Sequence, residues 1–273
     1  MSGPGILEQI AAARRPRIER LKVERPPHEL RARLSRTRPI GRLERALRRA
    51  RPSDPLRMIC EVKHTSPSRG VLDANVDPVA RARAFELGGA AAISLVTEPD
   101  FFHGDLGWID AVRPHVTIPL LLKDFVFDSY QLLDAAARGA DGVLLIAAML
   151  SEVSMQRLIS DARLLGLDAL VEVHDGGELN AALRAGATIV GINHRDLQTF
   201  EVDLSLSERL LPEIPGHVAT VAESGISRPE DLARLRATRC DSVLMGEVFM
   251  TSLDPTATLA TLAAAARGEG AGA

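Results

Sequence analysis

The sequence predicts an α/β protein, a (β/α)8 TIM barrel that follows an N-terminal helical extension. Three observations lead to this prediction. Short runs rich in Ile, Val and Leu alternate with stretches whose apolar residues recur at helical spacing, which is typical of a parallel sheet covered by helices. Eight such runs follow one another, the number of strands that closes this barrel. Four segments, LGGAAAISL, ARGADGVLLI, RAGATIVGI and ATRCDSVLMG, recur roughly every 50 residues and each leads from a helix into a strand.

The expected elements follow from the apolar pattern and the turn residues between the runs. The strands are expected at 58–63, 91–96, 118–123, 142–146, 168–173, 188–192, 217–222 and 242–245. The helices are expected at 77–88, 128–138, 151–165, 175–185 and 228–236. A doubly wound open sheet is the alternative architecture. Against it, no G-x-G-x-x-G motif follows the first strand.

The chain divides into three expected parts. Residues 1–50 are an N-terminal helical extension of two or three helices interrupted by prolines. Residues 51–265 are the (β/α)8 barrel, the catalytic domain. Residues 266–273 lie in a run of small residues, AAARGEGAGA, and are expected to form a flexible tail.

Basic residues are concentrated in the extension. Residues 1–51 carry 15 Lys and Arg against 5 Asp and Glu, a net charge of +10, so the rest of the chain carries −13. A basic arm can contact nucleic acid or a membrane. Here the arginines alternate with Leu and Ile at helical spacing, without the aromatic residues of a single-strand binder. We therefore expect amphipathic helices packed against an acidic body, with no nucleic-acid partner and no membrane contact.

The composition is that of an ordinary folded protein. The 273 residues are 46% hydrophobic and 25% charged, with a mean hydropathy of +0.04. No apolar run approaches the ~20 residues of a membrane span, and no secretory signal pattern is present. Cys60 and Cys240 lie in apolar segments, which indicates buried thiols in a reducing, cytoplasmic compartment. The Cys and His residues lack the spacing of a zinc site, so no metal is expected.

Polar residues follow the apolar part of most expected strands. Glu61 and Lys63 are two residues apart on one strand, so they face the same side. In a (β/α)8 barrel, the active site is built at the C-terminal ends of the strands. The other residues at this position are Lys123, Glu172, Asn193, Arg195, Glu223, Ser224, Gly225 and Gly246.

Each of these residues also has an ordinary structural explanation, such as a rim ion pair, a loop start or a turn. Gathered at one barrel mouth, however, two lysines and several glutamates would be a costly arrangement if stability were their only purpose. They suit acid–base chemistry on a charged substrate. We therefore interpret them together as a candidate active site.

The last two loops indicate a phosphate ligand. Ala222–Ile226 and Leu244–Glu247 place glycines after the seventh and eighth strands, and the second loop leads into a short helical stretch at Val248–Thr251. Exposed backbone N–H groups and a helix N-terminus attract anions. Loops in these two positions are the common phosphate site of such barrels. Four histidines near the same rim are interpreted as loop residues: His64, His103, His174 and His194.

The segment ICEVKHTSPSRG (59–70) resembles the signature of the indole-3-glycerol phosphate synthase family. The likeness spans about residues 5–255 and includes SLVTEPDFFHGDL, PLLLKDFVFDSYQ, ADGVLLIAAML, VEVHDGGEL, GINHRDLQTFEVDL, AESGI and VLMGEVFM. The resemblance implies a barrel lyase, a carboxy-lyase of tryptophan biosynthesis without a cofactor. Its reaction closes a ring, decarboxylates and dehydrates 1-(2-carboxyphenylamino)-1-deoxyribulose 5-phosphate, giving indole-3-glycerol phosphate, carbon dioxide and water.

The resemblance also implies catalytic roles. Lys123 looks like the general acid that protonates the ketone oxygen, with Glu61 paired to it. Lys63 resembles a ligand of the anionic substrate and a candidate acid for dehydration, and Glu172 looks like the other acid–base partner. Which lysine serves which step stays open in the sequence. The implied catalytic set is Glu61, Lys63, Lys123, Glu172, Asn193 and Ser224.

Binding roles follow from the same resemblance. The implied substrate-binding set, in which the phenylalanines line the anthranilate ring, is Ser66, Phe102, Phe125, Arg195 and Glu223. The implied phosphate-binding set is Lys63, Ser66, Gly225, Gly246 and the backbone amide of Glu247. His64 and Thr65 stand where basic residues are common. Glu247 stands where some relatives have Ser, so its side chain is expected to point away from the phosphate.

Two other functions are alternatives. Phosphoribosylanthranilate isomerase acts through a Cys/Asp pair, but Cys60 lies inside a strand before Glu61, and the Glu-x-Lys…Ser-Pro-Ser motif fits the synthase better. A non-catalytic binding barrel would have lost Lys123 or Glu172, and both are present. The expected partner is a small anionic sugar phosphate, and the expected state is a monomer or weak homo-oligomer.

Overall fold

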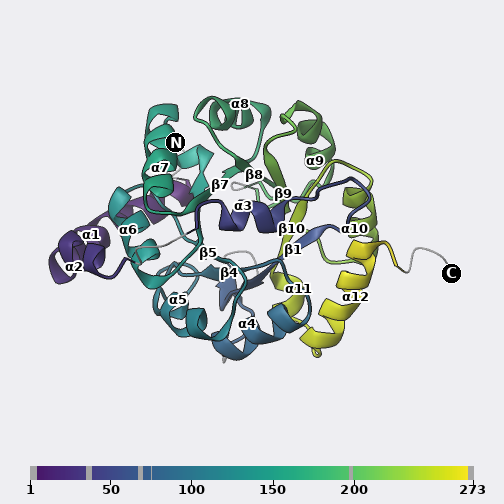
Figure 1. Ribbon diagram of the computed structural model, residues 1–273, viewed down its shortest axis with the longest axis horizontal. Helices are drawn as coiled ribbons and strands as arrows, with labels where there is room; N and C mark the ends of the chain where they lie inside the picture. Colours follow the sequence, from purple (N-terminus) through teal and green to yellow (C-terminus); the bar gives the residue numbers. More distant parts are fainter. Residues whose placement is uncertain (1–4, 35–38, 67–69, 75, 197–198, 270–273) are drawn as a thin grey trace.

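Eight parallel strands form a closed barrel surrounded by helices (Figure 1). The computed structural model describes residues 5–34, 39–66, 70–74, 76–196 and 199–269. The strands lie in the order β1-β10-β9-β8-β7-β6-β5-β4. They are β1 Arg57–Val62, β4 Ala92–Val96, β5 Leu120–Lys123, β6 Gly142–Ile146, β7 Asp168–Val173, β8 Ile189–Asn193, β9 Ala219–Glu223 and β10 Ser242–Met245. The predicted barrel is confirmed, and the open-sheet alternative is wrong.

The helices that the apolar spacing predicts are all present. They are α4 Pro78–Leu87, α6 Ser129–Arg138, α7 Glu152–Leu164, α8 Gly176–Arg184 and α10 Pro229–Arg236. An Asp or Ser side chain caps each of the first four by accepting a backbone N–H bond in the first turn. The expected short stretch after the eighth strand is α11 Glu247–Met250.

Several elements lie outside the sequence prediction. They are α5 Gly107–Val112, α9 Ser205–Leu210, α12 Pro255–Arg267, the 3-10 turns η1 Arg113–His115, η2 Ala147–Met149 and η3 Leu211–Glu213, and the antiparallel pair β2 Thr65–Ser66 and β3 Gly70–Val71. Both α5 and α9 have six residues, too few to show a helical period.

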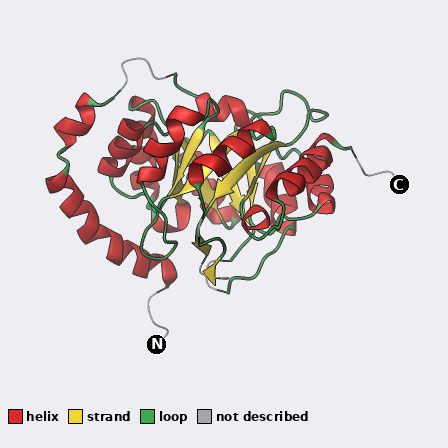
Figure 2. Cartoon of the chain, turned by 90° about the horizontal axis from the view of Figure 1, so that it is seen from below, coloured by secondary structure: helices red, strands yellow, loops and turns green. Residues whose placement is uncertain are grey.

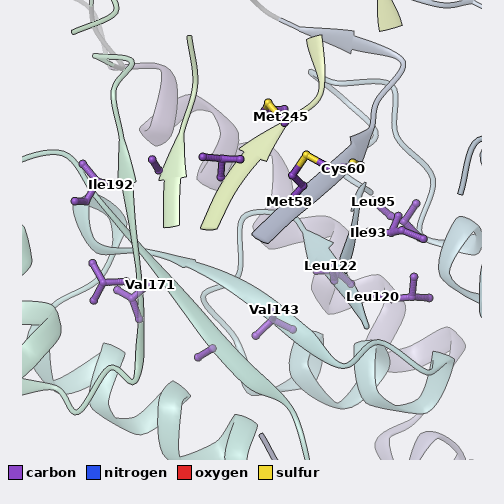
Figure 3. Close-up of a cluster of buried hydrophobic side chains, with 14 of the residues drawn as sticks. Met58, Cys60, Ile93, Leu95, Leu120, Leu122, Val143, Val171, Ile192 and Met245 are labelled. Carbon is purple, nitrogen blue, oxygen red and sulfur yellow. The ribbon is translucent and has the colours of Figure 1, made fainter. Parts of the chain in front are cut away.

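Strand side chains alternate between two apolar layers. One layer packs between the barrel and the surrounding helices, and its strand residues are labelled in Figure 3: Met58, Cys60, Ile93, Leu95, Leu120, Leu122, Val143, Val171, Ile192 and Met245. The other layer fills the barrel interior and includes Ile59, Leu121 and Leu170.

The same alternation positions the charged residues. Glu61, Lys123 and Glu172 each come two residues after a member of the interior layer, so they share its inward direction. They stand at or near the C-terminal ends of their strands. The two-residue alternation that builds the apolar interior therefore also places these charged side chains at the barrel mouth.

The N-terminal extension contains three helices, α1 Ile6–Glu24, α2 Pro27–Ala32 and α3 Arg42–Leu47. Helix α3 closes the N-terminal end of the barrel, where Leu43 and Leu47 are fully buried in the interior layer. Hydrogen bonds to the strands at both ends of the helix hold it there. The Leu43 backbone N–H donates to Asp168 Oδ2 at 2.8 Å, and Ser242 Oγ donates to the Leu47 carbonyl at 2.6 Å.

Helix α1 lies along the flank of the barrel, with its N-terminal end on the side of the β2–β3 hairpin (Figure 2). Basic side chains of the extension pair with acidic side chains of the body, as the charge distribution predicts. The pairs include Arg14–Asp124, Arg17–Asp100, Lys22–Asp128, Arg25–Asp134, Arg33–Asp110 and Arg42–Asp141. The most buried of them is Arg14–Asp124, at 2.6 Å.

The C-terminal segment differs from the expected tail. Helix α12 extends to Arg267, and Ala266 is buried against the body, so these two residues of the expected tail 266–273 are helical. Alanine is the strongest helix former, and the run of small residues supports the helix instead of ending it. Residues 270–273 lie outside the described part of the chain. Cys60 and Cys240 are buried free thiols, as expected. Within the described residues, no helix has the length and hydropathy needed to cross a membrane.

Candidate active site

A cavity of about 760 Å³ opens at the C-terminal ends of the barrel strands. The candidate residues that line it are Glu61, Lys63, Phe102, Lys123, Phe125, Glu172, Asn193, Arg195, Glu223, Ser224, Gly225, Gly246 and Glu247. Ser66 belongs to β2, but its side chain lies outside the described part of the structure. The barrel therefore brings together residues that are spread over nearly 190 positions of sequence between Glu61 and Glu247.

Lys123 stands between two carboxylates at the bottom of this cavity. Its Nζ lies 2.6 Å from Glu223 Oε2 and 3.0 Å from Glu172 Oε2. Burial alone would lower the pKa of Lys123, but the charges of Glu172, Glu223 and Glu61 outweigh burial and raise it. The lysine is therefore a buried ammonium group that stays protonated.

The two carboxylates around Lys123 are not equivalent. Burial raises the pKa of Glu223 to about 7, because the attraction of Lys123 does not fully offset burial and the repulsion from Glu172. The pKa of Glu172 is lowered, because Lys123 and His174 outweigh its burial. One oxygen of Glu223, Oε1, is buried without a hydrogen-bond partner among the described residues. Two neighbouring carboxylates with separated pKa values are suited to different roles in proton transfer.

Gly191 makes room for Glu223. Gly191 is on β8, and Glu223 on the adjacent strand β9 leaves no space for a side chain there, because a Cβ atom at Gly191 would lie 2.1 Å from Glu223 Oε1. The glycine therefore lets the Glu223 carboxylate lie against the strand and reach Lys123. The sequence interpretation did not single out this residue, because a glycine inside a strand can indicate a close approach but not which side chain approaches it.

Glu61 and Lys63 form a second ammonium–carboxylate pair. Lys63 Nζ lies 3.1 Å from Glu61 Oε1, and Ser94 Oγ donates to Glu61 Oε2 at 3.2 Å. The resemblance implies that Glu61 pairs with Lys123, and this expectation is corrected. The direct partners of Lys123 are two other carboxylates, because Lys63 shares the strand face of Glu61 and is closer to it.

Asn193 and Arg195 occupy the wall after β8. Asn193 Oδ1 accepts the backbone N–H of Arg195 at 3.0 Å, which fixes the turn between them. The Arg195 guanidinium lies 3.8 Å from the carboxylate of Glu247. Glu247 and Arg195 both line the cavity, and the acidic side chain of Glu247 is paired with the guanidinium of Arg195.

The loop after β9 has an unusual backbone conformation, with two consecutive residues of positive φ. Ser224 and Gly225 both have positive φ, 68° and 74°, and a Cβ at Gly225 would lie 2.3 Å from Val202. His194 supports this turn. Its Nδ1 faces the Ser224 carbonyl at 2.9 Å and must donate to it, so Nε2 accepts from Ser207 Oγ at 2.7 Å. Burial lowers the pKa of His194, which agrees with a neutral ring.

An apolar wall covers one side of the cavity. The rings of Phe102 and Phe125 lie 5.9 Å apart, and Leu144 and Ile146 of β6 line the same space. Glu98 holds the loop that carries Phe102, since its Oε2 accepts the backbone N–H groups of Phe101 and Phe102 at 2.7 and 3.0 Å. These apolar side chains make part of the cavity less hydrated than the part lined by its charged residues.

Comparisons with known proteins agree with this geometry. The family model described as indole-3-glycerol phosphate synthase matches residues 7–262. The chain belongs to the indole-3-glycerol phosphate synthase family. An indole-3-glycerol phosphate synthase of Sulfurimonas denitrificans is 50% identical over 78% of this chain and 81% of its own length. Indole-3-glycerol phosphate synthase 1 of Streptomyces coelicolor is 46% identical over 87% of each chain.

Solved structures support the fold. A chain described as KGPDC from Streptococcus mutans has a TM-score of 0.62 and 11% identity, covering 79% of this chain and 99% of its own. At that identity, the likeness shows the barrel alone. Membership of the indole-3-glycerol phosphate synthase family identifies the chain as a carboxy-lyase of tryptophan biosynthesis and implies a sugar-phosphate substrate.

For a member of this family, the structure adds site residues that the sequence interpretation missed. Ile6, Leu7 and Ile10 of α1 line the cavity, so the extension forms part of its wall. Glu98 follows β4 in the same way that the other polar residues follow their strands, and this signal could have identified it. His174 and His194 lie in loops, as expected, and the structure adds that His194 is 2% exposed and that the ring of His174 contacts Glu172.

Proposed function

We propose that this cavity converts 1-(2-carboxyphenylamino)-1-deoxyribulose 5-phosphate into indole-3-glycerol phosphate, with Lys123 as the general acid of ring closure. The observation that carries the assignment is the buried Lys123 ammonium held by Glu172 and Glu223 at the bottom of a cavity with one apolar wall. The reaction needs a proton at the ketone oxygen as the new carbon–carbon bond forms. A buried ammonium beside carboxylates supplies that proton.

Ring closure and decarboxylation follow from this arrangement. As the aryl carbon that bears the carboxylate attacks the ketone carbon, Lys123 Nζ gives its proton to the ketone oxygen, which becomes a hydroxyl group. The carbon–carbon bond to the carboxylate then breaks, carbon dioxide leaves, and the electron pair restores the aromatic ring. Phe102 and Phe125 hold the ring on the apolar side, where weak hydration favours loss of the carboxylate charge. Lys63 binds the anionic substrate before this step.

Dehydration needs an acid for the departing hydroxyl and a base for the proton on the nitrogen side of the ring. The Glu61–Lys63 pair, 3.1 Å apart, supplies one such set, and the Lys123–Glu172 pair supplies another. We assign the acid of dehydration to Lys63 and the proton acceptor to Glu172, whose pKa is lowered by Lys123 and His174 against its burial. Asn193, Arg195, Glu223 and Ser224 orient the substrate around these pairs.

The phosphate is proposed to bind at the loops after β9 and β10. Gly225 and Gly246 leave backbone N–H groups unshielded by side chains, and the amide of Glu247 begins α11. Lys63, which follows β1, and Ser66 are proposed as further phosphate ligands. Arg195 offsets the acidic side chain of Glu247, which otherwise would repel the phosphate.

Each proposed step moves a proton or changes a carbon–carbon or carbon–oxygen bond, and lysine and glutamate side chains supply all of these transfers without a cofactor. The substrate is the proposed partner, with no nucleic acid or membrane involved. The biosynthetic role and the two buried thiols support a cytoplasmic location. We propose a monomer or weak homo-oligomer, which light scattering across a concentration series tests directly.

The test of the proposed function is a direct assay with EDTA present. Purified protein is incubated with the carboxyphenylamino-deoxyribulose phosphate, and indole fluorescence is followed over time. Formation of indole-3-glycerol phosphate supports the substrate, the reaction and the absence of a metal requirement together. Binding without product from folded protein would instead favour a non-catalytic barrel. Neither binding nor product would overturn the assignment of the ligand.

A further inference from the structure

His174 lies next to the carboxylate of Glu172, the proposed proton acceptor. Glu172 belongs to β7, and His174 is the first residue after this strand, two positions further along the chain. His174 Nε2 lies 3.4 Å from Glu172 Oε1, the oxygen that Lys123 does not contact. This nitrogen is buried and makes no hydrogen bond among the described residues, so its contact with Glu172 is an ion pair when the ring is protonated. The two oxygens of Glu172 are therefore divided between a lysine and a histidine.

The other side of the imidazole is held by Glu178 in the first turn of α8. Glu178 Oε2 accepts the backbone N–H of His174 at 2.8 Å and lies 3.1 Å from its Nδ1. Asp175 caps the same turn by accepting the Glu178 backbone N–H at 2.8 Å. The start of α8 therefore fixes the direction of the ring as well as the position of Glu178.

Both ring nitrogens of His174 face carboxylates. Carboxylates accept hydrogen bonds, so both nitrogens donate when the ring is an imidazolium. The charged groups that face the ring are Glu172 from β7 and Glu178 from α8. Burial alone would lower the pKa of His174, but these two carboxylates outweigh it and raise that pKa to about 10. The side chain is 14% exposed, so water screens these interactions only weakly.

We propose that His174 is a positioning residue of the reaction: held by Glu178, its imidazolium orients Glu172 on Lys123 and keeps that carboxylate ionised. The inference rests on the proposed roles of Lys123 and Glu172. It adds a continuous row of alternating charges, Glu178–His174–Glu172–Lys123–Glu223, that leads from the first turn of α8 to the centre of the cavity lining. Without the imidazolium, Lys123 would have to balance two buried carboxylates alone.

The test compares two substitutions of His174. His174→Gln places an amide N–H near the position of Nε2 and keeps a neutral donor for Glu172, whereas His174→Asn is too short to reach Glu172. We expect His174→Asn to lower kcat about tenfold, a part of the ~10²-fold effect of a full acid–base group. Substrate Kd from fluorescence titration should change less than about twofold. His174→Gln should recover part of the loss. Exposed His115, the last residue of η1, provides the control His115→Gln with unchanged kcat.

The pH profile separates positioning from mere structural support. Removal of the imidazolium removes one cause of the low pKa of Glu172, so that pKa rises. Because Glu172 acts ionised, the acid limb of the kcat profile should move to higher pH in His174→Asn and less in Glu178→Gln. A wild-type kcat and pH profile in His174→Asn would overturn the inference. So would a loss of kcat that only follows a loss of folded protein.

A double-mutant cycle distinguishes this inference from the proposed function. If His174 acts through Glu172, the variant Glu172→Gln/His174→Asn should have the kcat of Glu172→Gln alone. Additive losses would show that His174 acts elsewhere and would overturn its assigned role. A nearly wild-type kcat in Glu172→Gln would instead overturn the proposed role of Glu172. Inactive Glu172→Gln with fully active His174→Asn would remove this inference and leave the proposed function intact.

Discussion

The Lys123 ammonium lies 2.6 Å from the carboxylate of Glu223, which follows it by 100 residues in the sequence. The same ammonium lies 3.0 Å from Glu172. One ammonium group is therefore the direct ion-pair partner of two buried carboxylates. This imbalance explains why the two carboxylates respond oppositely, with the pKa lowered at Glu172 and raised at Glu223.

Lys123→Ala should abolish turnover and leave substrate binding largely intact, because the proton donor is lost while the walls of the cavity remain. Glu172→Gln should lower kcat by about 10²-fold or more, the usual scale for an acid–base group. Steady-state kinetics and fluorescence titration of substrate give the two quantities separately. Retention of most of the kcat in either variant would remove that residue from the mechanism.

Glu223→Gln should alter how stability depends on pH. The folded-state pKa of Glu223 is raised to about 7 by burial, above its ordinary value of 4.5. The stability associated with its bound proton is fully present below pH 4.5 and is lost as pH rises through 7. Glutamine does not titrate, so Glu223→Gln should gain stability relative to wild type between pH 4.5 and 8. Urea unfolding at pH 5 and pH 8 measures this difference. The same difference at both pH values would contradict the shifted pKa.

Gly191→Ala should impair catalysis with little loss of folded protein. The added methyl group would lie 2.1 Å from Glu223 Oε1 and must push that carboxylate away from Lys123. A displaced catalytic group can cost roughly 10²-fold in rate. The matched control is Gly216→Ala, where a Cβ meets no atom within 4 Å. Kinetics and circular dichroism of both variants check the prediction, which an unchanged kcat in Gly191→Ala would refute.

Arg14→Met should destabilise the protein by about 3 kcal/mol, because it leaves Asp124 buried without its cation. Asp124 keeps hydrogen bonds from Thr97 Oγ1 and the Phe125 backbone, so Arg14→Met/Asp124→Asn should recover part of the loss. Urea denaturation of the two variants and the wild type gives the free energies of unfolding. The control is Arg17→Met, whose ion pair with Asp100 is about one-third exposed and should contribute under about 1 kcal/mol. Equal losses in Arg14→Met and Arg17→Met would contradict the special role of the buried pair.

Much of the barrel could be predicted from the sequence, because the relevant signals are local. Runs of Ile, Val and Leu identify the strands. The alternation of side chains along them places Glu61, Lys123 and Glu172 at the mouth of the barrel. The short helices α5 and α9 escaped prediction because six residues show no period. The last turn of α12 was not predicted, because a run of small residues suggests a flexible tail. Only the folded barrel provides the surface that buries Ala266.

The sequence by itself determined the barrel, the end of the barrel that carries charge, and the residue types gathered there. Only the tertiary structure decided which charges pair. Lys123 of β5 contacts Glu172 of β7 and Glu223 of β9 instead of Glu61. The physical reason is that an ion pair depends on the distance between two side chains, and these partners come from different strands of a closed barrel. Their separation is set by the order and register of those strands, which no local pattern encodes.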